Sequence, residues 1–502
     1  MIKYSIGQNL KKSDCLILPL FEDKGLDKEI KDLDKELEGL ISLAKEEKDF
    51  EAKTMKTSWI ITGNKDLPRI LLVGLGKEKE LNIALWKKIV GSFVITAQNK
   101  KVENLSVVLP NSITKKIDVK ILARETSTVI EIANYAYDEY KTDEKAKMVE
   151  IKNVEFFGED INKQFIEGSG LGQITGQGVN FTRHLGNTPP TIMTPTFLAK
   201  EAEKLGKNNA KVKVKVLDKE EMKKLGMGCM LAVARGSKEA PKFIIVEYWG
   251  ETKTKNPTIL VGKGVTFDSG GISLKPGDAL MEMKFDMLGA ATALGAIKSV
   301  IELKLKKNVI AILPAVENMP SGDAYRPDDI LTAMNGKTVE ILNTDAEGRL
   351  ILADALCYAA KYNPKEVIDL ATLTGACMVA LGIERSGVFG NQKIVDKVLQ
   401  TTEITGEKLW HLPIGDEYDE AMKSEVADIK NIGGVGGRSS FGGASTAAAF
   451  LEFFTKDEKG KALYPWAHID LASAIYASKG KPWVRVGANG AVVQTLVEYL
   501  KK

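Results

Sequence analysis

The chain has 502 residues, of which 44% are hydrophobic and 27% are charged, and this composition excludes collagen-like, coiled-coil and disordered proteins. Its 70 Lys and Arg residues against 67 Asp and Glu residues give a net charge of +3, which is too small to indicate a nucleic-acid or membrane surface. A chain of this length is expected to divide into two or three domains.

The first part of the chain alternates apolar runs with charged amphipathic stretches. The apolar runs predict strands at 15–20, 59–62, 70–73 and 105–109. One amphipathic helix is predicted between the first two strands, with an apolar face formed by Leu26, Ile30, Leu33, Leu37, Leu40 and Ala44. Because such alternation is typical of a mostly parallel sheet, residues 1–165 are predicted to form a smaller N-terminal α/β domain with a structural or assembly role.

Glycine and proline are concentrated between residues 166 and 195. The segment contains Gly168, Gly170, Gly172, Gly176 and Gly178, followed by Asn187-Thr-Pro-Pro-Thr-Ile-Met-Thr-Pro195. These residue types mark turns and loops and interrupt the alternation of strands and helices. We therefore predict that 166–195 is a connecting segment between two domains.

The alternation resumes in residues 196–502. Strands are predicted at 243–248, 258–261, 309–313 and 367–370, and helices at 194–205 and 349–361. We expect a larger C-terminal α/β domain with a mixed central sheet. The residues that could carry chemistry are concentrated in this part of the chain.

The four cysteines, Cys15, Cys229, Cys357 and Cys377, show no CxxC spacing, which excludes a disulfide framework and the usual thiolate zinc sites. The N-terminus does not resemble a secretion signal, and no stretch approaches the roughly 20 apolar residues that span a bilayer. The sequence therefore predicts a cytoplasmic protein that is not embedded in a membrane.

A buried strand near 258–261 leads into a glycine-rich loop that carries Lys263 and Asp268. Ligands often bind at such strand ends, but the glycines match neither GxGxxG nor GxxxxGK[ST], so a nucleotide loop is disfavoured. A tight surface turn with solvated charges is the alternative. Lys275 and Asp286 follow in the same stretch and favour a functional site.

Further acids occur at Asp345 and Glu347, after an apolar run and before a predicted helix. On extended backbone, residues two apart point to the same side, so both carboxylates could face one site. The alternative is helix capping, because Asn, Thr and Asp favour N-cap positions and acids favour the first turn. Arg349, one of few arginines, follows directly.

Four carboxylates from three separate segments would repel one another without a cation, and such oxygen-rich sets suit divalent metals, so a two-metal site is predicted. His184, His411 and His468 show no HExxH spacing, which disfavours a single-zinc protease. The absence of a GxSxG motif disfavours a serine hydrolase, and the apolar surroundings of Cys357 and Cys377 favour packing over a catalytic thiol.

These residues also carry a family resemblance. The string Asn343-Thr-Asp-Ala-Glu-Gly-Arg-Leu350 resembles the signature of the leucyl (cytosol) aminopeptidases, and segments 261–275 and 283–290 resemble the other two active-site segments of that family in order and separation. The likeness continues through 371–376, 427–431, 447–451 and 468–470 and covers roughly 180–495, whereas the N-terminal part is similar only in size and pattern. The sequence departs from the family pattern at Thr191, Ser473 and Gln494, which bears on the pocket shape or subunit contacts rather than on the metal site.

The resemblance implies an exopeptidase with two Mn²⁺ or Zn²⁺ ions per subunit. It assigns Asp268 and Glu347 as bridging ligands, Asp345 as a ligand of one metal, and Lys263 and Asp286 as ligands of the other. It also implies that Lys275 stabilises the oxyanion and that Arg349 holds a bicarbonate that shuttles the proton.

The same resemblance implies a substrate pocket and an assembly. The apolar pocket walls would be Met283, Ala472 and Ile475, and the cleft would be lined by backbone groups of Leu373 and Gly375. Such a pocket favours peptides with N-terminal Leu or Met, and the family forms homohexamers. Two alternatives stay open: a two-metal phosphoesterase, and a DNA-binding or regulatory protein that retains the metal site, although nucleic-acid binding is disfavoured by the charge balance.

Overall fold

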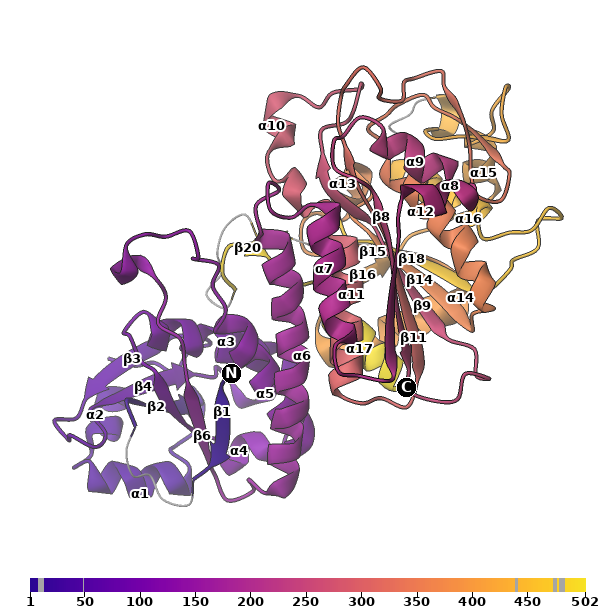
Figure 1. Ribbon diagram of the computed structural model, residues 1–502. Helices are drawn as coiled ribbons and strands as arrows, with labels where there is room; N and C mark the ends of the chain where they lie inside the picture. The colour runs from indigo at the N-terminus through magenta and orange to yellow at the C-terminus, as the bar shows by residue number, and fades with distance from the viewer. Residues whose placement is uncertain (8–12, 48, 438–440, 473–475, 478–483) are drawn as a thin grey trace. The chain divides into compact units, whose positions relative to one another are not determined.

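The computed structural model describes residues 1–7, 13–47, 49–437, 441–472, 476–477 and 484–502. The chain divides into two compact units, one formed by 1–180 and 477–486 and the other by 181–476 and 487–502. Both units are α/β, which confirms the predicted fold class (Figure 1). Among the described residues, no helix has both the length and the apolar character needed to cross a membrane.

The first unit is built on a six-stranded sheet in the order β1-β6-β5-β2-β4-β3, in which only the pairing of β3 with β4 is antiparallel. Apolar side chains of β2 are buried along its whole length, as the continuous apolar run predicted. The strands are β1 (Lys3–Ile6), β2 (Cys15–Leu20), β3 (Thr57–Ile61), β4 (Arg69–Gly74), β5 (Asn104–Val108) and β6 (Asn153–Phe157). The helices are α1 (Lys28–Glu36), α2 (Leu40–Glu46), α3 (Ile83–Gln98), α4 (Asn111–Thr114), α5 (Val119–Ala133) and the start of α6 (Lys163–Asn187), with 3-10 turns η1 (Glu78–Glu80) and η2 (Glu144–Ala146).

The single helix predicted over 26–44 is wrong, because the chain forms two helices there, α1 and α2. Glu38 and Gly39 between them have φ angles of 56° and 83°, in the left-handed region that ends a right-handed helix. Of the predicted apolar face, Ile30 is fully buried and Leu26, Leu33, Leu37 and Ala44 pack partly buried against the same core, whereas the buried residue of α2 is Ile41, which lies outside the predicted face.

Helix α6 occupies most of the glycine-rich stretch predicted as a connecting segment. Its glycines allow close packing against α5: a Cβ atom on Gly168 would lie 2.5 Å from the carbonyl oxygen of Lys120, and one on Gly172 would lie 2.1 Å from that of Arg124. Both contacts are too short for any side chain, so these glycines serve helix packing rather than a flexible loop.

The second unit is built on a nine-stranded mixed sheet. Its order is β16-β15-β18-β14-β9-β11-β8-β7, and β10 pairs with the last part of β11. The strands of this sheet are β7 (Val212–Leu217), β8 (Lys242–Trp249), β9 (Thr258–Gly262), β10 (Gly264–Asp268), β11 (Asn308–Asn318), β14 (Glu366–Ala371), β15 (Ser386–Gly390), β16 (Leu409–His411) and β18 (Trp466–Asp470). The mixed central sheet predicted from the sequence is thereby confirmed.

Helices cover both faces of this sheet, with α7 and α11 on one side and α12 and α16 on the other (Figure 1). Helices of the unit are α7 (Pro195–Gly206), α8 (Lys219–Lys224), α9 (Gly228–Ala234), α10 (Gly277–Leu280), α11 (Leu288–Glu302), α12 (Gly348–Ala359), α13 (Gly375–Leu381), α14 (Gln392–Thr405), α15 (Asp416–Ala421), α16 (Gly443–Phe453) and α17 (Val493–Lys501). The remaining elements are η3 (Met283–Phe285), η4 (Ala360–Tyr362), η5 (Val435–Gly437), β12 (Ile330–Thr332), β13 (Thr338–Glu340), β17 (Ile429–Lys430), β19 (Tyr476–Ala477) and β20 (Gly487–Ala488).

Strands β9 and β10 pair with the same partner, β11, one after the other, and are interrupted at Lys263. The register of β10 against β11 shifts between Val265 and Phe267, which is a β-bulge. On the other side, β9 pairs with β14, and the last contact of that pairing is the hydrogen bond of 2.9 Å from the Lys263 amide to the Leu370 carbonyl. After this hydrogen bond, β10 and the segment that follows β14 are no longer paired with each other. The candidate site lies at the point where the pairing ends.

Candidate metal centre

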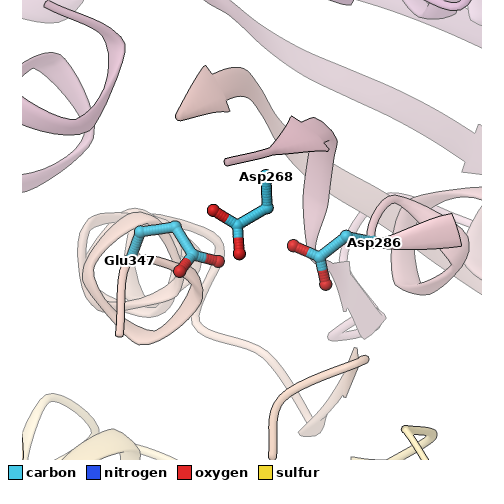
Figure 2. Close-up of side chains that lie close together, drawn as sticks. All are labelled: Asp268, Asp286 and Glu347. Atoms are coloured by element: carbon cyan, nitrogen blue, oxygen red, sulfur yellow. The ribbon is translucent and has the colours of Figure 1, made fainter. Parts of the chain in front are cut away.

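Three buried carboxylates converge where β9 and β14 end. Asp268 is the last residue of β10, Asp286 follows η3, and Glu347 immediately precedes α12. One oxygen of each carboxylate lies within 4.8 Å of an oxygen of the others, and Figure 2 shows the three groups pointing toward one another. Only 2%, 8% and 1% of these residues is exposed, respectively. The predicted convergence of acids from three separate segments is therefore observed.

The segment that carries Asp345 and Glu347 is not extended as the sequence analysis supposed. Strand β13 ends at Glu340 and belongs to a separate small sheet with β12 and β17, so the two acids follow a turn rather than a strand of the central sheet. Glu347 has φ −79° and ψ −35° and occupies the N-cap position of α12 without a capping hydrogen bond from its side chain. Its carboxylate is therefore directed to the site rather than used as a helix cap.

Two lysine ammonium groups contact the carboxylates. Lys263 Nζ lies 2.7 Å from Asp286 Oδ1 and 2.9 Å from Glu347 Oε1. Lys275 Nζ lies 2.9 Å from Asp268 Oδ2 and 2.5 Å from Asp345 Oδ1. The sequence-predicted site residues from all three segments are thus in one cluster.

Residues that the sequence analysis did not assign hold this cluster in place. Thr372 donates its hydroxyl to Asp286 Oδ1 at 2.7 Å and accepts from Lys263 Nζ at its carbonyl at 3.0 Å. Asn318, the last residue of β11, donates Nδ2 to Asp268 Oδ1 at 2.8 Å and to the Thr344 carbonyl at 3.0 Å. Thr372 lies two residues after the predicted strand 367–370, but Asn318 lies five residues after the predicted strand 309–313, so their positions along the chain gave little indication of this role.

Arg349 is buried in the first turn of α12. Its guanidinium donates one hydrogen bond of 2.8 Å to the Asn431 carbonyl, while its Nε atom has no hydrogen-bond partner in the described part of the chain. Burial lowers the pKa of Arg349 to about 10, although Glu347 and Asp470 oppose the shift, so the side chain stays cationic at neutral pH. A buried cation with a free donor fits a small anion.

The carboxylates lie in a cavity of about 540 Å³ within the second unit. Met283, Leu373, Gly375 and Ala472, all predicted to contact the substrate, line it. Ile475 and the family departure Ser473 lie outside the described residues. Thr191 and Gln494, the other departures, are not among the described residues that line this cavity.

The electrostatics of the cluster fit a divalent cation. Burial raises the pKa of Glu347 to about 8, with Asp268 as the next contribution, and burial raises the pKa of Asp286 to about 6. Burial would lower the pKa values of Lys263 and Lys275, but the neighbouring carboxylates raise both above their usual range. Asp286 Oδ2 is buried without a hydrogen-bond partner among the residues described. Four acids facing two ammonium groups, with one carboxylate oxygen unpaired, are a donor set suited to hard divalent metals.

In the absence of metal, the stability of the protein should fall as the pH rises. Because the pKa of Glu347 is raised in the folded state, the folded protein keeps a proton that the unfolded chain loses, and stability is lost progressively from about pH 4.5 to about pH 8. Asp286 contributes to the same loss of stability at lower pH, because its pKa is raised to about 6. Above about pH 6 Asp286 is ionised, so of these two carboxyl groups Glu347 alone still contributes. Thermal unfolding of chelator-treated protein between about pH 6 and pH 8 should therefore show a decline that Glu347→Gln makes shallower, and the part that remains includes Asp354, whose pKa burial raises to about 7. Parallel curves for the two proteins would contradict this assignment.

Comparison with known proteins places the chain among peptidases. The family model described as the catalytic domain of the cytosol aminopeptidase family matches residues 180–497, and the model of the N-terminal domain of the same family matches 17–144. The chain is 42% identical over 495 residues to a probable cytosol aminopeptidase of Alkalilimnicola ehrlichii, covering 97% of this chain and 96% of the relative. It is 41% identical over 499 residues to the cytosol aminopeptidase of Pseudomonas aeruginosa, covering 99% and 98%.

Solved structures give the same result. A tomato leucine aminopeptidase mutant is similar with a TM-score of 0.87 and 34% identity, covering 100% of this chain and 96% of that one. The bottromycin maturation enzyme BotP in complex with Mn is similar with a TM-score of 0.82 and 28% identity, covering 97% and 99%. The resemblance inferred from the three active-site segments is thus confirmed, and it extends beyond 180–495, because the N-terminal part also matches a domain of the same family. The chain belongs to the cytosol aminopeptidase family and is a metal-dependent exopeptidase.

Proposed function

We propose that this aminopeptidase removes the N-terminal residue of peptides, with a preference for Leu or Met, by two-metal hydrolysis. The observation that carries the proposal is the cluster of buried carboxylates from Asp268, Asp286 and Glu347 in a cavity that also has apolar walls. A phosphoesterase is disfavoured because, among the described residues that line the cavity, Arg349 is the one arginine that could contact a phosphate.

The residues proposed to hold two divalent ions, Mn²⁺ or Zn²⁺, follow the family resemblance. Asp268 and Glu347 would contact both ions, Asp345 one of them, and Lys263 and Asp286 the other. Lys263 would bind through its neutral amine, since an ammonium group has no lone pair. When bound, such a pair of ions lowers the pKa of water, polarises a carbonyl and holds the free amine of a peptide.

Lys275 and Arg349 are the proposed catalytic side chains. The raised pKa of Lys275 keeps its ammonium charged, so it can stabilise the negative charge that develops on the oxygen of the scissile carbonyl. Arg349, with its unpaired buried Nε, would hold a bicarbonate, which supplies a group able to transfer a proton to the leaving amine.

The proposed substrate pocket is apolar. Met283 and Ala472 would contact the side chain of the N-terminal residue, and backbone groups of Leu373 and Gly375 would contact the peptide. Ile475, which lies outside the described residues, is added to this pocket on the family resemblance alone. Thioether and aliphatic walls favour Leu and Met, whereas Asp or Glu would lose hydration without gaining a partner. Glu282, which precedes Met283 in the chain and also lines the cavity, adds to the penalty for acidic substrates.

Anilide substrates should therefore be hydrolysed in a defined order. The side-chain contacts that Ala lacks relative to Leu should be worth about 1.4 to 3 kcal/mol in total, so kcat/KM for Leu should exceed that for Ala by roughly 10- to 200-fold. Acetyl-Leu anilide should not be cleaved, because acetylation removes the free amine. Measurement of kcat/KM for Leu-, Met-, Ala-, Asp- and acetyl-Leu anilides tests this order: cleavage of the acetylated substrate refutes the proposed mode of binding, and a preference for Asp refutes the apolar pocket.

We propose a homohexamer located in the cytoplasm, with the N-terminal domain, 1–165, serving assembly. The support is the family resemblance. Light scattering should give a mass about six times the 54.8 kDa of the chain. A fully active monomer at nanomolar concentration would contradict the assembly.

A further inference from the structure

Asp470 is a buried carboxylate that the mechanism above does not use. It is the last residue of β18, lies opposite Ala371 of β14 and Gly387 of β15, and is 0% exposed. We propose that Asp470 is a positioning residue that fixes the two walls of the substrate pocket relative to each other and thereby sets the discrimination between large and small N-terminal residues. The inference rests on the proposed function, because it takes Leu373 and Ala472 as walls of the pocket.

The hydrogen bonds of the Asp470 carboxylate go to both walls. Oδ1 accepts from the Leu373 amide at 3.1 Å and from the Ala472 amide at 3.0 Å, and Oδ2 accepts from the Thr374 hydroxyl at 2.7 Å. Leu373 follows β14 and Ala472 follows β18, so one carboxylate joins the segments that leave two neighbouring strands. Hydrogen bonds to an ionised acceptor are roughly twice as strong as neutral ones, and these are sheltered from water.

The wall formed by 372–374 is held from two directions. Toward the metal centre, Thr372 bonds to Lys263 and Asp286. Away from it, Asp470 holds the next two residues, and Thr374 Oγ1 in turn accepts from the Cys377 amide at 3.0 Å at the start of α13. If the contact to Asp470 is lost, Thr372 still anchors the metal side, while Leu373 and Ala472 can move apart. The expected result is a wider pocket next to an intact metal centre.

Asp369 offers a matched control. Asp369 is also 0% exposed. It lies on β14, two residues before Ala371, which is the residue that pairs with Asp470 across the two strands. Its carboxylate accepts from Trp466 Nε1 at 2.7 Å and contacts His468 Nδ1 at 2.6 Å, both within β18 rather than in the segments that line the cavity. Removing its charge therefore perturbs the same sheet without touching either wall.

The experiment compares Asp470→Asn with Asp369→Asn. The measured quantity is the ratio of kcat/KM for Leu anilide to that for Ala anilide, which does not depend on the fraction of folded enzyme. Asp470→Asn should lower this ratio by about five-fold or more, since an unfixed wall loses the methylene contacts that favour Leu. Metal content should stay at the wild-type level. Asp369→Asn should lower the melting temperature and leave the ratio unchanged.

A second pair of variants covers the case in which Asp470→Asn does not fold. Thr374→Val removes the hydroxyl that donates to Asp470, whereas Thr374→Ser retains it. The Val variant should lower the Leu/Ala ratio and the Ser variant should restore it. An unchanged ratio in every folded variant of Asp470 and Thr374, or an equal fall in Asp369→Asn, overturns the inference. A wild-type enzyme without a preference for Leu over Ala would instead refute the proposed pocket.

Discussion

The Glu347→Ala variant should have no measurable aminopeptidase activity and should bind fewer divalent ions than the wild type, and Asp268→Ala should behave in the same way. Both carboxylates are buried, are proposed to contact both metal ions, and lie with Asp286 within 4.8 Å of one another. Asp286 cannot take the place of either one, because its carboxylate is fixed by Lys263 and Thr372. Hydrolysis of leucine p-nitroanilide and the metal content of the purified variants measure the two effects.

Glu366→Ala is the control for the loss of a buried acid. Glu366 begins β14, accepts from the Thr258 hydroxyl at 3.0 Å and from the Tyr499 hydroxyl at 2.9 Å, and does not line the cavity in the described structure. This variant should unfold at a lower temperature but keep its metal content and its activity per folded molecule. Chelation of the wild type should abolish activity reversibly, and activity retained by metal-free wild type would contradict the two-metal mechanism.

Lys275→Met should lower kcat by a factor of roughly 10² or more without changing the metal content. Its ammonium group contacts Asp268 and Asp345 and is kept charged by them, so the charge is available next to the reacting carbonyl. Because this charge is proposed to act on the transition state more than on the bound substrate, KM should change little. Steady-state kinetics with leucine p-nitroanilide and metal analysis of the same preparation measure both quantities.

Lys275→Arg tests whether a positive charge alone restores the rate or whether the shape of the lysine side chain is also needed. A guanidinium keeps the positive charge but is planar and larger, so it should recover only part of the lost rate. A selective rise in KM in Lys275→Met would show that the residue binds substrate instead. Loss of metal from that variant would show that the ammonium group organises Asp268 and Asp345.

The acids of the site could be predicted from the sequence because charged residues in glycine-rich loops after apolar strands have few structural reasons to be there. The local backbone around Glu347 could not be predicted. Two carboxylates can lie near each other either two residues apart on a strand or in the segment before a helix. The structure has the second arrangement, because β13 belongs to a separate small sheet. No role was assigned to Thr372, Asn318 or Asp470, although 371–376 and 468–470 carry the family likeness, because neutral or lone polar residues at strand ends have no pattern of their own.

The fold was predictable where hydrophobic periodicity was strong and uninterrupted. Strand β2 begins and ends at the predicted residues, and α7 lies within one residue of its predicted limits. Helix α6 was missed because its glycines, which favour loops in isolation, are required by the close approach of α5. The inclusion of 477–486 in the first unit has no local signal, since it depends on contacts far apart in the chain.

The bulge in β10 determines which residues can share the metal centre. Lys263 and Asp268 are separated by an odd number of positions, and on a regular strand such residues point to opposite faces of the sheet. Lys263 lies in the break between β9 and β10, which keep one register against β11 up to Val265. The register shift between Val265 and Phe267 adds one residue to β10 relative to β11 and reverses the parity, and both side chains line the same cavity. The spacing of Lys263 and Asp268 therefore brings both side chains to one cavity only because the bulge lies between them. A chain with the same motif on an ideal strand would place its lysine and its aspartate on opposite sides of the sheet.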